Sequence, residues 1–356
     1  MTLLLIGGFL GSGKTTAIVN ASHHLLSIKR KVAVITNDQG NQQVDTAVVR
    51  NNGIPADEVA NGCFCCHYKE LDNRINQLME RYDPAIIFAE AVGSCTDLIA
   101  TVALPLIKYK QIPVVVSVFA DAEFLQFMLD NKTQLMSENI LYIFSKQIEE
   151  ADLVIVNKKD RLTTEQITQM NQILEVKYPS KIFLFQNSLV EKDIRQWLDI
   201  VEKFPDRTMK PLNIDYEQYA KGEAELAWLD QTLIISTQYE NAVFISRQII
   251  GKIFDSIQEQ RLPIGHLKFM LENSHGHEKI GFTTMSTSST VRLKLKESNT
   301  ISMMINARVQ TLPETLISVI DSVVDDVIHI PGVTIECKDR SAFVPGYPRP
   351  TYRLSE

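Results

Sequence analysis

The sequence lacks the features that mark membrane, nucleic-acid-binding and disulfide-rich proteins. No apolar run approaches the roughly 20 residues that a helix needs to cross a bilayer, so no membrane partner is expected. The 36 lysines and arginines are outnumbered by 43 aspartates and glutamates, and the net charge of −7 offers no basic surface for nucleic acid. The 5 cysteines do not resemble a disulfide framework, which favours a reducing, cytoplasmic location.

Internal repeats and low-complexity tracts are also missing, which is typical of an ordinary globular protein. The 356 residues, of which 45% are hydrophobic and 22% charged, provide material for two hydrophobic cores. The leucine run at residues 3–5 has no basic segment before it and leads directly into a glycine-rich loop. We therefore do not expect a signal peptide there.

That glycine-rich loop, residues 8–15, reads G-x-x-x-x-G-K-T. It follows an apolar run and precedes a helical pattern at residues 16–27, which is the context of a phosphate-binding P-loop rather than of an ordinary glycine turn. Backbone N–H groups of such a loop surround phosphates, Lys14 would reach the β- and γ-phosphates, and the Thr15 hydroxyl would bind Mg²⁺. The predicted nucleotide-binding residues here are Gly8, Gly11, Ser12, Gly13, Lys14, Thr15 and Thr16.

Residues 157–160 indicate which base the nucleotide carries. They read N-K-x-D and follow the apolar, β-branched run at 152–156. The Asp160 carboxylate would accept hydrogen bonds from guanine, whereas adenine has no matching donors and would leave that acceptor unpaired. Asn157 would tie the segment to the P-loop, and Lys158 would cover the base. A charged loop after a strand is the alternative, but together with the P-loop the motif favours GTP and GDP.

A cluster of thiols lies between these two motifs. Cys63, Cys65 and Cys66 fall within four residues. Clustered thiolates suit a soft or borderline ion such as Zn²⁺ or Co²⁺, and three protein ligands leave a fourth position open for transfer. A redox-active or merely buried cluster is the alternative. His67 is either a fourth ligand or a solvent-facing side chain.

The order of apolar runs predicts the fold class. Strands are expected at residues 2–6, 32–36, 86–90, 113–119, 152–156 and 181–185, with helical patterns between them. This alternation predicts an α/β P-loop NTPase with a mainly parallel sheet, and ligands at the carboxyl ends of its strands. We assign that domain to residues 1–205, a linker to 206–230, and a smaller α+β domain to 231–356. In the last segment we expect strands at 232–237, 264–271, 278–285, 289–296, 300–307 and 328–337, and helices at 241–258 and 313–327.

Six segments in this order resemble the CobW-like family of P-loop GTPases, which is related to the UreG and HypB metal-insertion GTPases: GFLGSGKTT, VITNDQG, NGCFCCHYKEL, IIFAEAVGSCTDL, SVFADAEF and QIEEADLVIVNKKD. The resemblance covers about the first 190 residues. It implies a GTP-hydrolysing metallochaperone, usually linked to zinc. Some members of the family serve cobalt in cobalamin metabolism or the metal loading of nitrile hydratase.

The resemblance also assigns roles to two further segments. Asp38 stands in the switch segment near Mg²⁺ and the γ-phosphate, where Gln39 replaces the usual aromatic residue. Glu90 would hold a Mg²⁺-bound water or orient the attacking water, and the backbone N–H of Gly93 would sense the γ-phosphate. Alanine and valine occupy positions 91 and 92, where the family commonly has hydroxyls, which predicts slow hydrolysis. The predicted catalytic residues are thus Lys14, Asp38 and Glu90. Cys95 is either an additional thiol ligand or a packed small residue.

Two functions are compatible with these features. The first is a GTP-dependent metallochaperone that binds zinc or cobalt at Cys63, Cys65 and Cys66 and delivers it to a client metalloprotein. The second is a GTPase that activates or remodels a cobalamin- or corrinoid-dependent enzyme without carrying metal itself. Association of the chain into a homodimer is compatible with either function.

Overall fold

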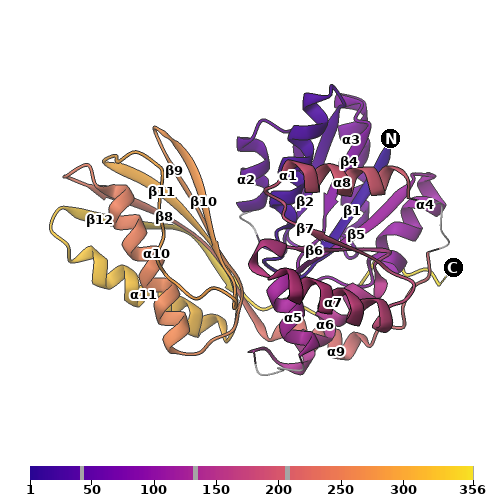
Figure 1. Ribbon diagram of the computed structural model, residues 1–356. Coiled ribbons are helices and arrows are strands. Elements are labelled where there is room, and N and C mark those ends of the chain that lie inside the picture. The colour runs from indigo at the N-terminus through magenta and orange to yellow at the C-terminus, as the bar shows by residue number, and fades with distance from the viewer. Residues whose placement is uncertain (41–43, 131–134, 205–208, 356) are drawn as a thin grey trace. The chain divides into compact units, whose positions relative to one another are not determined.

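The computed structural model describes residues 1–40, 44–130, 135–204 and 209–355. The chain forms two compact units, each shown in Figure 1. The first contains residues 1–39, 45–222 and 347–356, and the second contains 40–44 and 223–346. The last ten residues therefore belong to the unit that carries the P-loop. The predicted linker at 206–230, of which 206–208 lie outside the described residues, includes a helix and the start of a strand.

The first unit is built on a parallel sheet of seven strands in the order β3-β2-β4-β1-β5-β6-β7. Its apolar strands are buried, as expected for a parallel sheet covered by helices on both faces. The strands are β1 (Thr2–Gly8), β2 (Val32–Asn37), β3 (Ala56–Val59), β4 (Ile86–Glu90), β5 (Val114–Asp121), β6 (Leu153–Asn157) and β7 (Ile182–Gln186). Six of them confirm the predicted strands to within about two residues at each end; β3 was not predicted.

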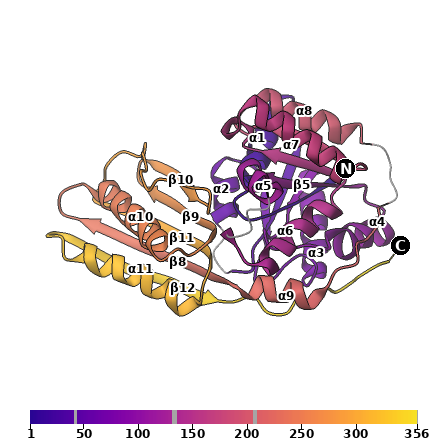
Figure 2. The same ribbon diagram turned by 60° about the horizontal axis from the view of Figure 1, so that its bottom comes forward.

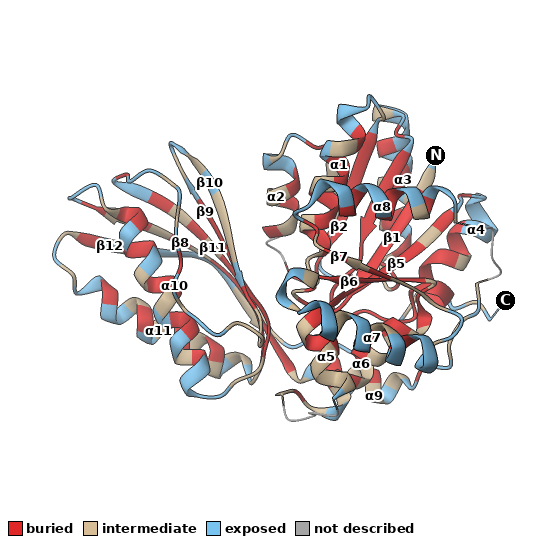
Figure 3. Ribbon diagram, viewed as in Figure 1, coloured by how far each residue is buried: buried red, intermediate tan, exposed pale blue. Residues whose placement is uncertain are grey.

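Helices cover both faces of this sheet (Figure 2). One face packs its apolar side chains against α1 and α8, whose Trp197 is fully buried, and the other against α3, α5 and α6. Figure 3 shows buried strands between helices whose outer surfaces are exposed. The helices are α1 (Lys14–Ser27), α2 (Val44–Asn51), α3 (Tyr68–Tyr82), α4 (Leu104–Lys110), α5 (Ala122–Leu129), α6 (Glu138–Glu150), α7 (Thr164–Lys177), α8 (Glu191–Glu202) and α9 (Tyr216–Ala224).

The second unit is an antiparallel sheet of five strands, in the order β10-β9-β11-β8-β12, with two helices packed on one face. The strands are β8 (Leu226–Thr237), β9 (Ile264–Asn273), β10 (Gly276–Phe282), β11 (Thr300–Gln310) and β12 (Val333–Phe343), and the helices are α10 (Ala242–Glu259) and α11 (Pro313–Ile328). The predicted fold class, a mainly parallel α/β unit followed by a smaller α+β unit, is confirmed.

One strand of the second unit was predicted wrongly. Residues 289–296 form a loop instead of a strand. The backbone N–H groups of Lys294 and Leu295 donate to the Glu278 carboxylate at 2.6 and 3.2 Å, so a side chain takes the place of a neighbouring strand. The alternation of apolar and polar residues at 289–296 could not show whether the backbone bonds to another strand or to a side chain.

Candidate functional site

The P-loop lies between β1 and α1, so the amino end of α1 points at the loop. Gly13 has a φ of 91°, and a Cβ there would come within 2.4 Å of the Asn157 amide nitrogen, so any other residue would be strained and would displace Asn157. Lys14 Nζ donates to the Gly8 carbonyl at 2.8 Å. The Ser12 hydroxyl is buried and has no hydrogen-bond partner among the described residues. A phosphate in this loop would meet a lysine, a hydroxyl and the helix amino end together.

An oxygen-rich group lies beside the P-loop. The Thr15 hydroxyl lies 2.8 Å from Asp45 Oδ1 and 3.0 Å from Glu90 Oε1. Threonine and carboxylate oxygens are the ligands that Mg²⁺ prefers, so these residues fit that cation directly or through its water. The sequence analysis named Thr15 and Glu90 but missed Asp45, which lies in the first turn of α2 and belongs to no recognisable motif.

The other predicted switch residues lie at the ends of two neighbouring strands. Asp38 follows β2 and is buried, and its backbone N–H donates to the Val59 carbonyl at 3.3 Å. Gly93 follows β4, and a Cβ there would lie 3.1 Å from Leu10 Cα. The backbone after Glu90 therefore packs directly against the P-loop. Their roles toward the nucleotide stay predictions.

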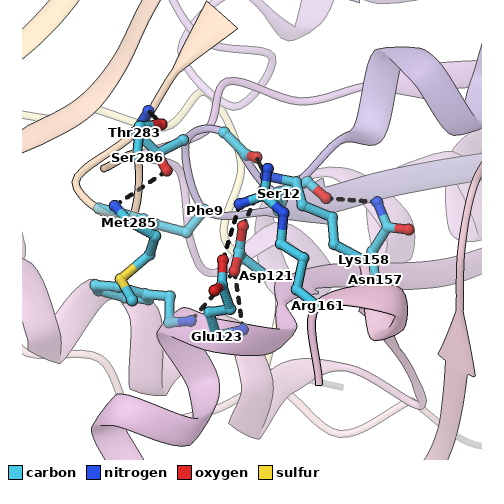
Figure 4. A network of polar contacts seen from close by, with 12 residues as sticks. Phe9, Ser12, Asp121, Glu123, Asn157, Lys158, Arg161, Thr283, Met285 and Ser286 are labelled. Atoms are coloured by element: carbon cyan, nitrogen blue, oxygen red, sulfur yellow. Dashed lines mark hydrogen bonds and ion pairs between the residues drawn. The ribbon is translucent and has the colours of Figure 1, made fainter. Parts of the chain in front are cut away.

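The N-K-x-D segment contacts the P-loop through two side chains (Figure 4). Asn157 Nδ2 donates to the Ser12 carbonyl at 2.8 Å. Lys158 Nζ donates to the Gly11 carbonyl at 2.7 Å and to Asp121 Oδ2 at 2.6 Å. Asp160 is exposed in the short turn Lys159–Arg161. Its carboxylate is therefore accessible to a base that lies over this loop.

Two residues that orient this segment were missed from the sequence. Ser188 follows β7 and donates to Asn157 Oδ1 from both its backbone nitrogen, at 3.1 Å, and its hydroxyl, at 2.8 Å. Because the amide oxygen is held there, the Asn157 nitrogen faces the P-loop. Asp121 pairs with Lys158 and also accepts hydrogen bonds from the first backbone N–H groups of α5. Only the packed sheet brings these residues together.

The thiol cluster lies in the loop of residues 61–67, which we call the cysteine loop. Cys63 and Cys65 are buried and Cys66 is half-buried, and their sulfurs lie within 4.8 Å of one another. Cys63 Sγ is 2.8 Å from Cys65 Sγ, and Cys65 Sγ is 3.8 Å from Cys66 Sγ. Among the described residues, this group of potential metal ligands does not include His67, whose ring packs over Gly62.

The three thiols differ in acidity. Hydrogen bonds from Cys65, Cys66 and Cys95 hold the pKa of Cys63 well below its usual range. The same hydrogen bond with Cys63 raises the pKa of Cys65, and the one between Cys63 and Cys66 raises the pKa of Cys66 to about 11. Cys63 is thus the thiol that loses its proton first and can bind a cation first.

Asn37 connects the cysteine loop to the end of β2. Its side-chain nitrogen donates to the carbonyls of Val59 and Gly62, at 2.9 and 2.6 Å. Its side-chain oxygen accepts from the backbone N–H of Phe64 at 2.8 Å. One amide therefore satisfies three backbone groups around the thiols and sits next to Asp38 of the predicted switch segment.

The end of the chain lies on the cysteine loop as well. We call residues 347–355 the C-terminal strap. The Arg349 backbone N–H donates to Cys66 Sγ at 3.3 Å, and Thr351 donates to the carbonyls of Cys65 and Cys66 at 2.8 and 3.0 Å. The Tyr352 ring packs edge-to-face on Tyr68 at 5.1 Å. Nothing in the sequence analysis predicted this contact with the thiols.

The fold and the P-loop define a P-loop nucleotide-binding protein that also carries a thiol cluster. The chain belongs to the CobW/HypB/UreG family of P-loop GTPases, whose nucleotide-binding domain matches residues 2–185.

The chain is also similar to individual known proteins. The chain is 32% identical over 171 residues to the zinc chaperone YeiR of Escherichia coli, covering 45% of this chain and 47% of YeiR. It is 25% identical over 216 residues to the zinc chaperone CobW of Pseudomonas aeruginosa, covering 53% and 56%. The chain thus spans about half the length of these relatives. HypB of Helicobacter pylori in complex with nickel gives a TM-score of 0.42 at 16% identity, covering 57% of this chain and 86% of HypB. None of the described helices is long and apolar enough to span a membrane.

Proposed function

We propose that the chain is a GTP-hydrolysing metallochaperone that binds zinc or cobalt at Cys63, Cys65 and Cys66 and delivers it to a client metalloprotein. Family membership supports the GTPase part, and the names of the relatives YeiR and CobW support a zinc cargo. The observation that carries the proposal is the Asn37 amide, which joins the end of β2 to the backbone around the thiols. A reducing cytoplasm would keep the thiols available.

In the nucleotide site, each residue has a role that its contacts support. Lys14 would exchange the Gly8 carbonyl for the β- and γ-phosphates, and Asp160 would accept from guanine. Thr15, Asp45 and Glu90 would hold Mg²⁺, which supplies positive charge to the phosphates. Glu90 would also orient the attacking water. Because Ala91 and Val92 offer no side-chain donors to the γ-phosphate, we expect slow turnover.

In the metal site, three thiolates would bind the cargo and leave a position for its transfer. Tetrahedral zinc–sulfur bonds of about 2.3 Å place two sulfurs roughly 3.8 Å apart. Cys65 and Cys66 already have a sulfur separation of 3.8 Å, whereas Cys63 and Cys65, at 2.8 Å, would have to move apart. Cys63, with its low pKa, would be the first ligand that the ion meets. Cys66 is half-buried, so the ion could leave from its side of the site.

Coupling between the two sites would follow from shared segments. A γ-phosphate that draws in Asp38 also moves Asn37, and Asn37 holds the backbone of the cysteine loop. Ordering of switch segments by a γ-phosphate and its Mg²⁺ is a common device of GTPases. Hydrolysis would release those segments and loosen the thiol site for hand-off.

The test is metal stoichiometry in the full chain under reducing conditions. We expect one tightly bound Zn²⁺ per chain, lost in Cys65→Ser because a hydroxyl replaces thiolate poorly, with GTP binding retained. Cys337→Ser is the matched control, because Cys337 is exposed on β12. If the parent chain binds no metal while it hydrolyses GTP, the metallochaperone proposal is wrong and a GTPase that activates another enzyme is favoured.

A further inference from the structure

Cys95 is buried beside the cysteine loop, although it lies 29 residues beyond Cys66 in the sequence. It is 1% exposed and follows the segment that begins at Glu90. Its side chain is close enough to the thiols of both Cys63 and Cys65 to affect their pKa values. Four of the five cysteines therefore lie in one region, where three are buried and Cys66 is half-buried, and the fifth, Cys337, is exposed in the other unit.

The backbone of Cys95 is fixed from two directions. Its N–H donates to the Val92 carbonyl at 3.0 Å. Gln147, which is buried on α6, donates to the carbonyls of Gly93 and Cys95 at 3.0 and 2.8 Å. Because these hydrogen bonds fix the backbone of residues 93–95, any shift of that segment would carry the Cys95 thiol with it.

The C-terminal strap also joins the two thiol-bearing segments. At one end, the Thr351 backbone N–H donates to the Cys65 carbonyl at 2.8 Å. Beyond it, Arg353 Nε pairs with Asp97 Oδ2 at 2.8 Å, and the Leu354 N–H donates to the Ala100 carbonyl at 2.9 Å. One short stretch of chain thus holds both the cysteine loop and the segment after Cys95.

We propose that Cys95 is a fourth thiolate ligand, so that the chain can bind its metal through Cys63, Cys65, Cys66 and Cys95. This inference rests on the proposed function and adds the residue that completes a tetrahedral site. The sulfurs of Cys63, Cys65 and Cys66 lie within 4.8 Å of one another, and Cys95 is outside that group. Binding of an ion by all four thiolates would therefore bring Cys95 and Cys66 closer together. Each thiol that binds gives its proton to solvent.

This ligand would link the cargo directly to the nucleotide. Cys95 lies two residues after Gly93, whose backbone packs on Leu10 of the P-loop. When the γ-phosphate moves that backbone, the Cys95 thiolate would enter or leave the coordination shell. The metal would then alternate between a closed site of four thiolates and an open site of three, which is the difference between holding and releasing a cargo.

The experiment is a Co²⁺ titration of the full chain, followed by the near-ultraviolet absorbance that each cobalt–thiolate bond contributes. Cys95→Ala should lose about a quarter of the parent absorbance, one thiolate in four, and bind Co²⁺ at least about tenfold more weakly. Cys337→Ala, the control, should match the parent. Unchanged GTP affinity of Cys95→Ala in the absence of metal, where no cargo is coupled to the nucleotide, would show that its fold is intact.

Three results would contradict either the fourth ligand or the proposed function, and they can be told apart. Parent-level absorbance and affinity in Cys95→Ala would overturn the fourth ligand and leave the three-thiolate site standing. An equal loss in Cys337→Ala would overturn it too, because the absorbance would then not report on this site. No thiolate absorbance in the parent chain would instead contradict the proposed function itself.

Discussion

Glu150 is a buried acid of the first unit, and the fold controls its protonation. Its carboxyl group is 2% exposed at the end of α6 and accepts from the Thr96 hydroxyl at 3.3 Å and from the Ile99 N–H at 3.4 Å. Burial, together with the nearby negative charge of Asp97, raises the pKa of Glu150 from 4.5 to about 8. Near neutral pH the folded chain therefore keeps a proton that the unfolded chain releases.

The stability of the fold should depend on pH through this group. Between pH 4.5 and 8 the folded state binds the extra proton, so the Glu150 contribution is complete below that window and is lost as the pH rises through it. The decline should approach about 1.4 kcal/mol per pH unit. Glu150→Gln should remove this decline, which urea unfolding at several pH values would measure.

A control substitution tests whether the pH dependence comes from the buried position of Glu150 or from the loss of any negative charge. Glu175→Gln changes an exposed glutamate on α7 and should leave the pH dependence as it is in the parent. A Glu150→Gln variant whose stability still falls with pH as steeply as the parent would show that another group binds the proton.

Asp160 is the residue on which the choice of base depends. Asp160→Asn replaces an acceptor by a donor, so GTP binding should weaken by about 10- to 100-fold, as hydrogen bonds to a charged group contribute about 1.5–3 kcal/mol. Binding of xanthosine triphosphate should improve, because its C2 oxygen needs a donor. Competition among GTP, ATP and XTP would measure this, with exposed Asp199→Asn as the control. Equal affinity of the parent for ATP and GTP would refute the guanine assignment.

At the scale of elements, the strap depends on an ion pair with a buried partner. Asp97 is 1% exposed and accepts from Arg353 Nε at 2.8 Å and from the Tyr216 hydroxyl at 2.7 Å. Arg353→Gln would remove the positive charge and leave the buried carboxylate with the tyrosine alone. We expect the free energy of unfolding to fall by about 1–3 kcal/mol and a chelator to remove bound zinc faster.

Arg349→Gln is the control for that variant within the same strap. Arg349 is exposed, and its contact with Cys66 uses the backbone N–H, which the substitution retains. Equal loss of stability in both variants would contradict the role given to the Arg353–Asp97 pair. Zinc removal at the parent rate in Arg353→Gln would show that the strap does not hold the metal site.

The sequence predicted those elements that a short run of consecutive residues determines. Apolar runs located six of the seven parallel strands, and the G-x-x-x-x-G-K-T and N-K-x-D motifs lie at strand ends, as predicted. The short edge strand β3 escaped, since its Ala-Asp-Glu-Val sequence has no apolar run. Residues that act through tertiary contacts also escaped: Asp45 reaches Thr15, and Ser188 reaches Asn157, only after the sheet has formed. Tail residues such as Thr351 could not be placed, because nothing in their spacing points to a loop about 285 residues away.

For the whole molecule, the P-loop, the thiol cluster and the strap all belong to the first compact unit. The second unit has its own core between its sheet and helices α10 and α11. The proposed coupling between nucleotide and metal would therefore need only contacts within the first unit, through Asn37 and the backbone from Glu90 to Cys95. The proposed ligands of both sites all belong to the first unit.

The most direct test of this coupling is a chelator-competition titration of Zn²⁺ in the presence of a non-hydrolysable GTP analogue and of GDP. We expect the two affinities to differ by about fivefold or more, and zinc to change the affinity for the analogue relative to GDP by the same factor, since linkage is reciprocal. Asn37→Ala should shrink the ratio, while Asn171→Ala on α7 should preserve it. Identical zinc affinities in the two nucleotide states of the parent chain would contradict a GTP-gated metal carrier.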